Sequence, residues 1–335
     1  MSAAPTTLGV YEADSSVYKE LLIAITQIGT QPVDYDLVFD TGSGGMVIDA
    51  NGMIPGSMIT STGFNFAGDS TIVNGITITN QTSTIQYGDD FASTSNVYGN
   101  LAYAPVTIGD EHGNIAIKRL PFFLYYKATD GKGKVDPLPH DFDTFGVDEE
   151  YDATFANNAY VTSPFSYFSP GNGLTSGFKI AALGTSNFSY DGTYSAVLTL
   201  GLTTDDLSSS SGFATSLLTY DAGDGYAPIV PGTVTYNNKS FATDVLFDTG
   251  TEPDNYLEDP TLSGPSIMLP DSSAVKLTTP FGFNYSYTTT ATDNLTLVEN
   301  PNTSGGGLTI FGIEFFLNNE YLLDFADHKL GVKNN

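Results

Sequence analysis

Apolar and polar residues follow one another along this chain in short runs. The apolar runs, such as 21–26, 35–39 and 245–247, are separated by Gly, Asn, Asp and Ser, and long stretches with helical periodicity are almost absent. Short runs bounded by turn-forming residues are typical of β-strands. The chain also has 20 Tyr and 22 Phe, and aromatic residues favour strands. The pattern predicts an all-β protein.

Three local patterns give more specific expectations. The run 21–26 carries β-branched residues and stops at Gly29, so it is predicted to be a strand. Asn74 and Gly75 lie between two apolar pairs and predict a tight hairpin turn. Ser163 followed by Pro164 predicts the start of a short helix over 163–168.

One sequence, Phe-Asp-Thr-Gly, occurs twice, at 39–42 and at 247–250. Each copy follows an apolar run, so each predicts a buried strand that delivers an Asp into a turn. A single such Asp would be an ordinary turn residue that bonds its own backbone. Two copies with matching apolar leads favour a second interpretation, in which Asp40 and Asp248 are two halves of one catalytic site.

Two facing carboxyl groups have a useful chemistry. They cannot both ionise easily, so they share a proton and titrate as a unit with separated pKa values. One is then an acid and the other a base at the same pH. A water held between Asp40 and Asp248 could lose a proton to one carboxylate while the other protonates a peptide carbonyl oxygen. Such a pair would hydrolyse a peptide without an acyl-enzyme.

At these residues the chain resembles the pepsin-like aspartic proteases, in which the shared-proton dyad is known. Residues 28–40 are similar to the strand pair that leads into the first catalytic loop, and 85–89 to the flap that covers the cleft. Segments 144–146 and 310–312 resemble the two apolar-apolar-Gly segments of that family, and 311–332 follows its C-terminal pattern. These segments come in the order of that family.

The resemblance implies a bilobal, all-β aspartic endopeptidase whose substrate lies extended between an N-terminal lobe, 1–200, and a C-terminal lobe, 201–335. It implies that Asp40 and Asp248 form the dyad. The threonines after each Asp would brace the two loops against each other, and the hydroxyls two residues later would bond the outer carboxylate oxygens. The implied supporting residues are Thr41, Gly42, Ser43, Thr249, Gly250 and Thr251, and the implied flap residues are Tyr87, Gly88 and Asp89.

Two departures from the family leave an alternative open. The chain has no Trp, so the usual partner of the flap Tyr87 is missing. After the second motif, residues 252–255 read Glu-Pro-Asp-Asn, and the helix that the family has next could lie only in 267–277, which Pro270 interrupts. The alternative is a catalytically silent binding or inhibitor protein with this fold. A very selective processing protease is a second rival.

Composition narrows the classes of partner. The chain has 38 Asp and Glu against 11 Lys and Arg, a formal net charge of -27. Nucleic acid and anionic membrane surfaces are poor partners for such a field, whereas work in acid, or plain solubility, suits it. The absence of Cys excludes a thiol nucleophile and a cysteine-ligated metal. The three His are scattered, so neither a metal nor a cofactor is expected.

Location and assembly follow only as expectations. No apolar run approaches the length of a membrane-spanning helix, and residues 1–7 lack the basic start and apolar core of a signal peptide. We therefore expect a mature form of a secreted or otherwise extracytoplasmic protein. It should act as a monomer on a protein or peptide substrate.

Peptide hydrolysis should be fastest below neutral pH. One member of the dyad must stay protonated to act as the acid, so the rate should fall as rising pH removes that proton. The pH dependence of kcat/KM on an unfolded protein substrate measures this, and a rate that still climbs in mildly alkaline buffer would contradict it.

Overall fold

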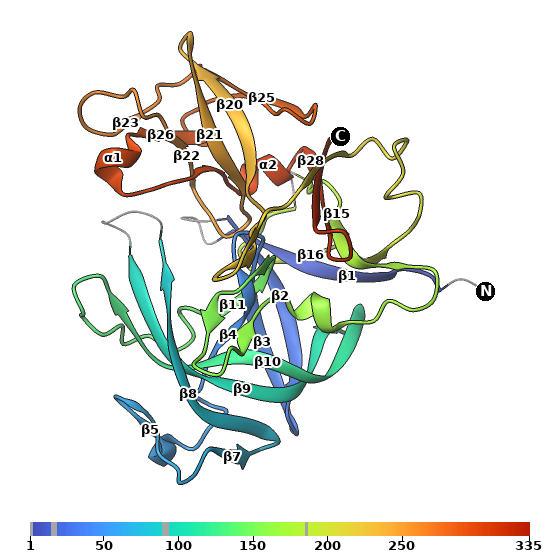
Figure 1. Ribbon diagram of the computed structural model, residues 1–335, viewed down its shortest axis with the longest axis vertical. Coiled ribbons are helices and arrows are strands. Elements are labelled where there is room, and N and C mark those ends of the chain that lie inside the picture. Colours follow the sequence, from blue (N-terminus) through green and yellow to red (C-terminus); the bar gives the residue numbers. More distant parts are fainter. Residues whose placement is uncertain (1–2, 15–18, 89–93, 185–186) are drawn as a thin grey trace.

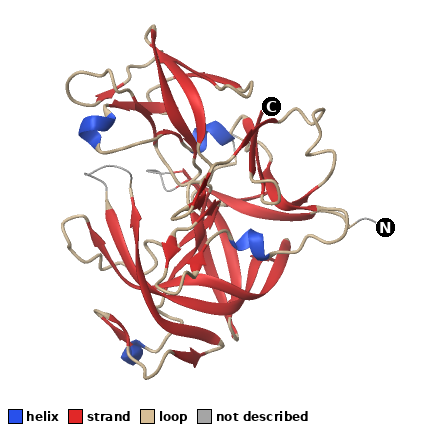
Figure 2. Ribbon diagram, in the orientation of Figure 1, coloured by secondary structure: helices blue, strands red, loops and turns tan. Residues whose placement is uncertain are grey.

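The computed structural model describes residues 3–14, 19–88, 94–184 and 187–335. Strands dominate it, and helices are few and short (Figure 2). The prediction of an all-β, bilobal fold is confirmed: two large sheets lie in two lobes, one above the other in Figure 1.

Among the described residues, fourteen strands form the larger sheet. It contains the predicted strand at 21–26, within β2 (Lys19–Ile28). It also contains the long hairpin of β9 (Ser95–Asp110) and β10 (Gly113–Asp130), which lies in the lower lobe of Figure 1. In spatial order the strands are β17 (Ala214–Leu217), β29 (Lys329–Asn334), β28 (Asn319–Asp324), β15 (Thr175–Ile180), β16 (Thr193–Leu202), β1 (Thr6–Asp14), β2 (Lys19–Ile28), β3 (Gln31–Asp40), β11 (Thr144–Val147), β4 (Gly44–Asp49), β10 (Gly113–Asp130), β9 (Ser95–Asp110), β8 (Ile76–Tyr87) and β7 (Ser70–Val73).

The second sheet forms the upper lobe, in gold and orange in Figure 1. Its described strands, in spatial order, are β23 (Ile267–Met268), β26 (Leu295–Glu299), β22 (Asp254–Glu258), β27 (Thr309–Phe311), β21 (Lys239–Phe247), β20 (Val230–Tyr236), β24 (Ala274–Thr278) and β25 (Asn284–Thr288). The prediction of a helix in 267–277 is wrong, because β23 and most of β24 lie in that segment.

Small elements complete the described part of the chain. Short pairings join β12 (Glu149–Glu150), β19 (Gly225–Tyr226) and β18 (Tyr220–Asp221), β13 (Ala153–Thr154) and β14 (Tyr160–Val161), and β5 (Ile59–Thr60) and β6 (Gly63–Phe64). The helices are α1 (Pro301–Ser304), α2 (Ile313–Phe316) and the 3-10 turns η1 (Gly56–Met58) and η2 (Pro164–Tyr167). The predicted short helix at 163–168 is therefore η2.

The hairpin predicted at Asn74 and Gly75 is confirmed. Val73 of β7 pairs with Ile76 of β8, and the two residues between them have φ of 52° and 78°. Positive φ at both central positions is what a tight hairpin turn needs, and Asn and Gly tolerate it.

The C-terminal strands do not stay in the upper lobe. β28 pairs with β15, and β15 with β16, which in turn pairs with the N-terminal β1. These strands lie beside the two lobes, on the right of Figure 1. The lobe boundary expected at residue 200 stays a prediction.

The duplicated motif has a duplicated setting. β3 ends at Asp40 and lies parallel to β11, which also pairs antiparallel with β4. β21 ends just before Asp248 and lies parallel to β27, which also pairs with the antiparallel β22. Each Asp therefore lies at the end of a strand that runs parallel to a second strand, β11 or β27. The second strand is in turn paired with a third, β4 or β22.

An aromatic core supports each of these strand pairs. Phe39 stacks on Phe145 with ring centroids 6.5 Å apart, and Phe247 stacks on Phe311 at 6.1 Å. All four side chains are fully buried. Replacing a buried Phe by Ala typically costs about 3–5 kcal/mol, so these rings fix the position of the strand ends.

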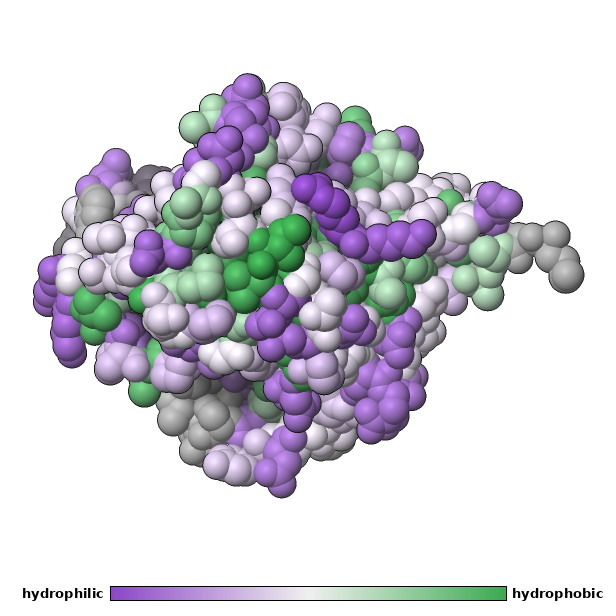
Figure 3. Space-filling model, turned by 90° about the horizontal axis from the view of Figure 1, so that it is seen from below, coloured by the Kyte–Doolittle hydropathy of each residue, from purple (hydrophilic) through white to green (hydrophobic). Residues whose placement is uncertain are grey.

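One face of the molecule carries polar, neutral and hydrophobic residues side by side (Figure 3). Figure 3 shows one face, where hydrophilic residues surround a small hydrophobic area. In the described part of the chain, no helix is long and apolar enough to cross a membrane.

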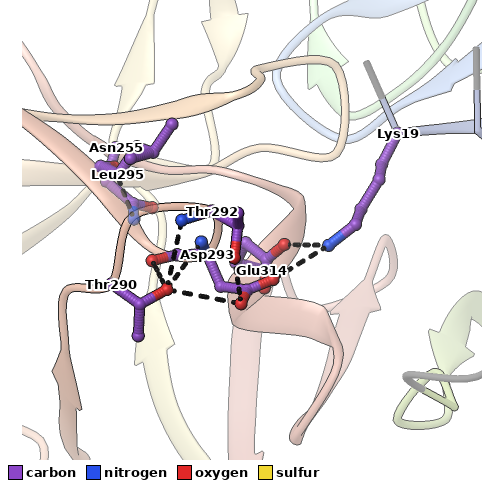
Figure 4. Close-up of polar contacts among 7 residues, drawn as sticks. All are labelled: Lys19, Asn255, Thr290, Thr292, Asp293, Leu295 and Glu314. Carbon is purple, nitrogen blue, oxygen red and sulfur yellow. Dashed lines mark hydrogen bonds and ion pairs between the residues drawn. The ribbon is translucent and has the colours of Figure 1, made fainter. Parts of the chain in front are cut away.

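A polar contact joins β2 to the second half of the chain. Figure 4 shows the Lys19 ammonium between the carboxylates of Glu314, on α2, and Asp293. Lys19 bonds Glu314 and lies 3.7 Å from Asp293, which Thr292 holds by a hydroxyl bond of 3.0 Å. The Lys19 and Glu314 side chains are only 25% and 11% exposed. This cation therefore compensates a largely buried carboxylate.

Lys19→Met should lower the free energy of unfolding by about 1–3 kcal/mol, because Glu314 would keep its burial and lose its counter-charge. Chemical denaturation measures the loss. Lys329→Met is the control, since the Lys329 pair with Asp327 is far more exposed and should matter much less. Equal losses in the two variants would contradict the inference.

Candidate active site

The two Asp carboxylates are held in the same way. The Gly42 N–H donates to Oδ1 of Asp40 at 2.7 Å, and the Ser43 hydroxyl donates to Oδ2 at 2.6 Å. In the second copy the Gly250 N–H and the Thr251 hydroxyl donate to the corresponding oxygens of Asp248, at 2.7 and 2.5 Å. Each carboxylate thus receives two hydrogen bonds from its own loop, which fix its orientation.

Thr41 and Thr249 tie the two loops together. The N–H of each donates to the hydroxyl of the other at 3.0 Å. The Thr41 hydroxyl donates on to the Phe247 carbonyl at 2.8 Å, and the Thr249 hydroxyl to the Phe39 carbonyl at 2.6 Å. Both threonines are buried. The bracing that the resemblance implied is present, with four hydrogen bonds between segments about two hundred residues apart.

The glycines show that the two carboxylates face each other. A Cβ on Gly42 would lie 2.5 Å from Cγ of Asp248, and a Cβ on Gly250 would lie 2.7 Å from Cγ of Asp40. Such distances are severe overlaps, so each loop needs Gly because the opposite carboxyl group packs against it. The positions predicted from the two motifs therefore meet at one place.

Burial and charge act together on this pair. Asp248 is 8% exposed. Burial first, and then the negative charge and the hydrogen-bonding contact of Asp40, raise the pKa of Asp248 well above its ordinary value. The Thr251 and Gly250 donors only partly oppose this. The pKa of Asp248 is thus held high by burial and by the carboxyl group that faces it.

A cleft of about 640 Å³ opens over the two carboxylates. The predicted residues that line it are Asp40, Gly42, Ser43, Tyr87, Gly88, Asp248, Gly250 and Thr251, while Thr41 and Thr249 lie behind it. Apolar lining comes from both lobes, with Ile85 on β8 and with Leu246, Leu308 and Ile310 on the other side. The predicted Asp89 lies outside the described residues.

Tyr87, at the end of β8, has an aromatic neighbour. It stacks on Phe142, with centroids 6.3 Å apart and planes 14° from parallel. Its hydroxyl is shielded from solvent and has no hydrogen-bond partner among the described residues. Burial, and then the charge of Asp152, raises the pKa of this hydroxyl well above its ordinary value, while the nearby Thr144 hydroxyl opposes the rise.

The sequence motifs did not predict several of the carboxylates that line the cleft. Glu150, Asp152, Asp224 and Glu252 also line it. The first two belong to an acidic run directly after the segment 144–146, and that position was a usable signal. Asp224 lies in an ordinary Gly-containing turn between β18 and β19, so only the pairing of β12 with β19 brings it here.

Glu150 and Glu252 hold their protons more tightly than free carboxyls. Burial, and then the charges of Asp224 and Asp40, raise the pKa of Glu150 to about 7. Burial, and then the charge of Glu20, raises the pKa of Glu252 to about 9. Asp148, which has no exposed area, lies behind the cleft, and burial followed by the charge of Glu150 raises its pKa as well.

Potential metal ligands do not converge in the cleft. In the part of the chain that the structure describes, three ligand atoms come within 4.8 Å of one another only at Asp110, Glu111 and His112. None of these residues lines the cleft, and the Tyr11 hydroxyl and the His112 N–H already bond the Asp110 carboxylate.

Comparison with known proteins defines the fold. No protein-family model and no curated protein sequence matches the chain. The chain is similar in structure to an aspartic proteinase from Irpex lacteus, with a TM-score of 0.62, 16% identity, and coverage of 98% of this chain and 97% of the other. It is also similar to Basic 7S globulin from soybean and to conglutin gamma, a basic 7S globulin from lupine seeds, each with a TM-score of 0.59, 13% identity, and coverage of 99% of this chain and 96% of the other.

The chain therefore has the bilobal pepsin-like fold. Because the neighbours include globulins as well as a proteinase, the fold alone does not decide between catalysis and binding. The catalytic roles of the residues in the cleft stay predictions.

Thr41→Val and Thr249→Val should each lower the free energy of unfolding by about 2–4 kcal/mol, because each removes two buried hydrogen bonds and strands their partners. The double variant should lose less than the sum, since all four bonds form one network. Urea unfolding of the three variants measures this.

Thr235→Val is the matched control. The Thr235 hydroxyl bonds only the Ser240 hydroxyl on an exposed strand surface, so its loss should be at most about 1 kcal/mol. The four hydrogen bonds of Thr41 and Thr249 form a cross-brace between the two loops. Strictly additive losses in the two variants, or losses no larger than that of the control, would show that this cross-brace does not hold the loops.

Proposed function

We propose that this chain is an aspartic endopeptidase that hydrolyses peptide bonds with a water activated between Asp40 and Asp248. The observation that carries the proposal is the facing pair of carboxyl groups, each oriented by a Gly N–H and a hydroxyl, at the floor of a cleft. A structural turn would need neither the cross-brace of the threonines nor the close approach of each Gly to the opposite Asp.

The two carboxyl groups divide the work. The raised pKa of Asp248 makes it the acid, which donates its proton to the carbonyl oxygen of the scissile peptide. Asp40, as the carboxylate, takes a proton from the water, and the water oxygen bonds to the carbonyl carbon. Collapse of this tetrahedral intermediate breaks the C–N bond. The proton held by Asp40 goes to the leaving nitrogen, and one hydroxyl of the intermediate returns a proton to Asp248 as the C=O bond re-forms. Asp40 is then again the carboxylate and Asp248 again the acid.

The cleft fits an extended peptide as substrate. It lies between the two lobes, with the end of β8 on one side and the loop after β21 on the other. Tyr87 would cover the bound peptide and exclude water from the reacting atoms. No cofactor takes part in this chemistry. We further infer that the protein works as a monomer in an acidic, extracytoplasmic setting, which its net charge of -27 tolerates because carboxyl groups lose charge in acid.

A binding protein is the second candidate. Two structural neighbours are globulins, and the segment after the second motif places Glu252 in the cleft, with a buried Oε1 that has no hydrogen-bond partner among the described residues. A protein of this kind would bind a peptide or a transition-state analogue of the pepstatin type and release it unchanged.

Asp40→Asn and Asp248→Asn should each reduce cleavage of an unfolded protein at least about 100-fold, because each removes the acid or the base. Cleavage is followed from acid to neutral pH, with and without an analogue of the pepstatin type, which should abolish it in the wild type. Both variants should keep the melting temperature, since Asn preserves the shape of Asp.

Asp205→Asn is the matched control, because Asp205 is exposed and lies outside the cleft. It should cleave as the wild type does. Near-normal turnover in either dyad variant would exclude the shared-proton mechanism. If the wild type binds the analogue but cleaves no substrate, the protein is a binding protein instead.

A further inference from the structure

The cleft is rich in carboxyl groups. Six of its lining residues carry carboxyl groups, Asp40, Glu150, Asp152, Asp224, Asp248 and Glu252, and none of its lining residues is Lys, Arg or His. Described lysines form their ion pairs elsewhere, as Lys19 does with Glu314 and Lys179 with Asp206. No cation of the cleft lining therefore compensates these carboxylates, and a ligand that enters the cleft meets only negative charge and neutral groups.

Two of these carboxylates come together because of one small strand pairing. Glu150 pairs with Gly225 across β12 and β19, and the Tyr151 N–H donates to the Asp224 carbonyl at 2.8 Å. Glu150 and Asp224 are thus anchored by backbone bonds at one side of the cleft. The ring of Tyr151, which also lines the cleft, is fixed by stacking on Tyr160 with centroids 3.9 Å apart.

Behind this pair, further carboxylate oxygens lack partners. Asp148 has no exposed area, and its Oδ2 has no hydrogen-bond partner among the described residues. Oδ2 of Asp152, on the cleft lining, is likewise shielded and unpaired within the described part of the chain. Buried carboxylate oxygens without donors are costly, and a positively charged group nearby would relieve that cost.

We propose that Glu150 and Asp224 form a subsite that selects a lysine or arginine side chain of the peptide, beside the bond that the dyad cleaves. This inference rests on the proposed function, and it gives the substrate class that the cleft favours. A long organic cation fits better than a metal ion, because no three ligand atoms of the cleft lie within 4.8 Å of one another among the described residues.

The selection should depend on pH. The charges of Asp224 and Asp40 act on Glu150, and Asp148 and Asp152 also lie close to it, so all its charged neighbours are carboxyl groups. Because these groups and burial raise the pKa of Glu150 to about 7, it is largely neutral in acid and gains charge towards neutrality. A preference for a cationic side chain should therefore grow as pH rises from about 5 to about 7.

Binding to the Asp40→Asn variant tests the inference without turnover. The probes are two octapeptides that differ only in lysine or norleucine beside the central bond, because norleucine keeps the length of lysine without its charge. The lysine peptide should bind at least about tenfold more tightly near neutral pH. Glu150→Gln or Asp224→Asn, added to this variant, should bring the ratio of the two dissociation constants close to one.

Glu111→Gln is the control, since it removes one exposed carboxylate outside the cleft and should leave the ratio unchanged. Equal binding of the two peptides, or a ratio that Glu150→Gln and Asp224→Asn do not lower, would overturn the inference. Displacement of the lysine peptide by millimolar calcium would also overturn the inference if Glu150→Gln abolished that displacement, because the site would then be a metal site.

Cleavage by the wild type separates this inference from the proposed function. Bonds cut in a mixture of unfolded proteins should be enriched in flanking Lys or Arg. Cleavage without that enrichment contradicts the subsite alone. A complete absence of cleavage, together with tight and selective binding of the lysine peptide, contradicts the proposed hydrolysis and leaves the subsite supported.

Discussion

The site depends on bringing two like charges close together and keeping them there. Asp40 and Asp248 repel each other once both ionise, and each is attached to a separate sheet. The cross-brace of Thr41 and Thr249 is the direct link that holds their loops against this repulsion. Because its hydrogen bonds are buried, water does not compete for them, so they define the separation of the two carboxyl groups.

The rest of the fold supports that link from both sides. Phe39 and Phe247 lie directly before the two Asp residues, and each stacks on a ring of the neighbouring parallel strand. Their backbone carbonyls are also the acceptors of the two threonine hydroxyls. Core packing and the polar brace are therefore coupled through the same residues, and a shift in either aromatic core would move a carboxylate.

The acidic surroundings of the dyad distinguish this cleft from a simple catalytic pair. Glu150, Asp152, Asp224 and Glu252 add negative charge at both sides of Asp40 and Asp248. They favour protonated carboxyl groups, and they also favour a cationic ligand, whose positive charge would partly offset the first effect. Since a proteinase and two globulins share this fold, such local charges, more than the fold, carry the information about function.

Sequence alone determined the features that depend on local patterns. The alternation of short apolar runs predicted an all-β fold, Asn74 and Gly75 predicted a turn with positive φ, and the repeated Asp-Thr-Gly predicted which two carboxylates would meet. Tertiary structure alone decided what comes from distant segments. Asp224 reaches the cleft only because β19 pairs with β12, and the ring of Phe142 stacks on that of Tyr87 only because the segment before β11 packs against the end of β8. The pKa of Glu150 likewise depends on burial and on the charges of Asp224 and Asp40, which are properties of the folded chain and of no local pattern.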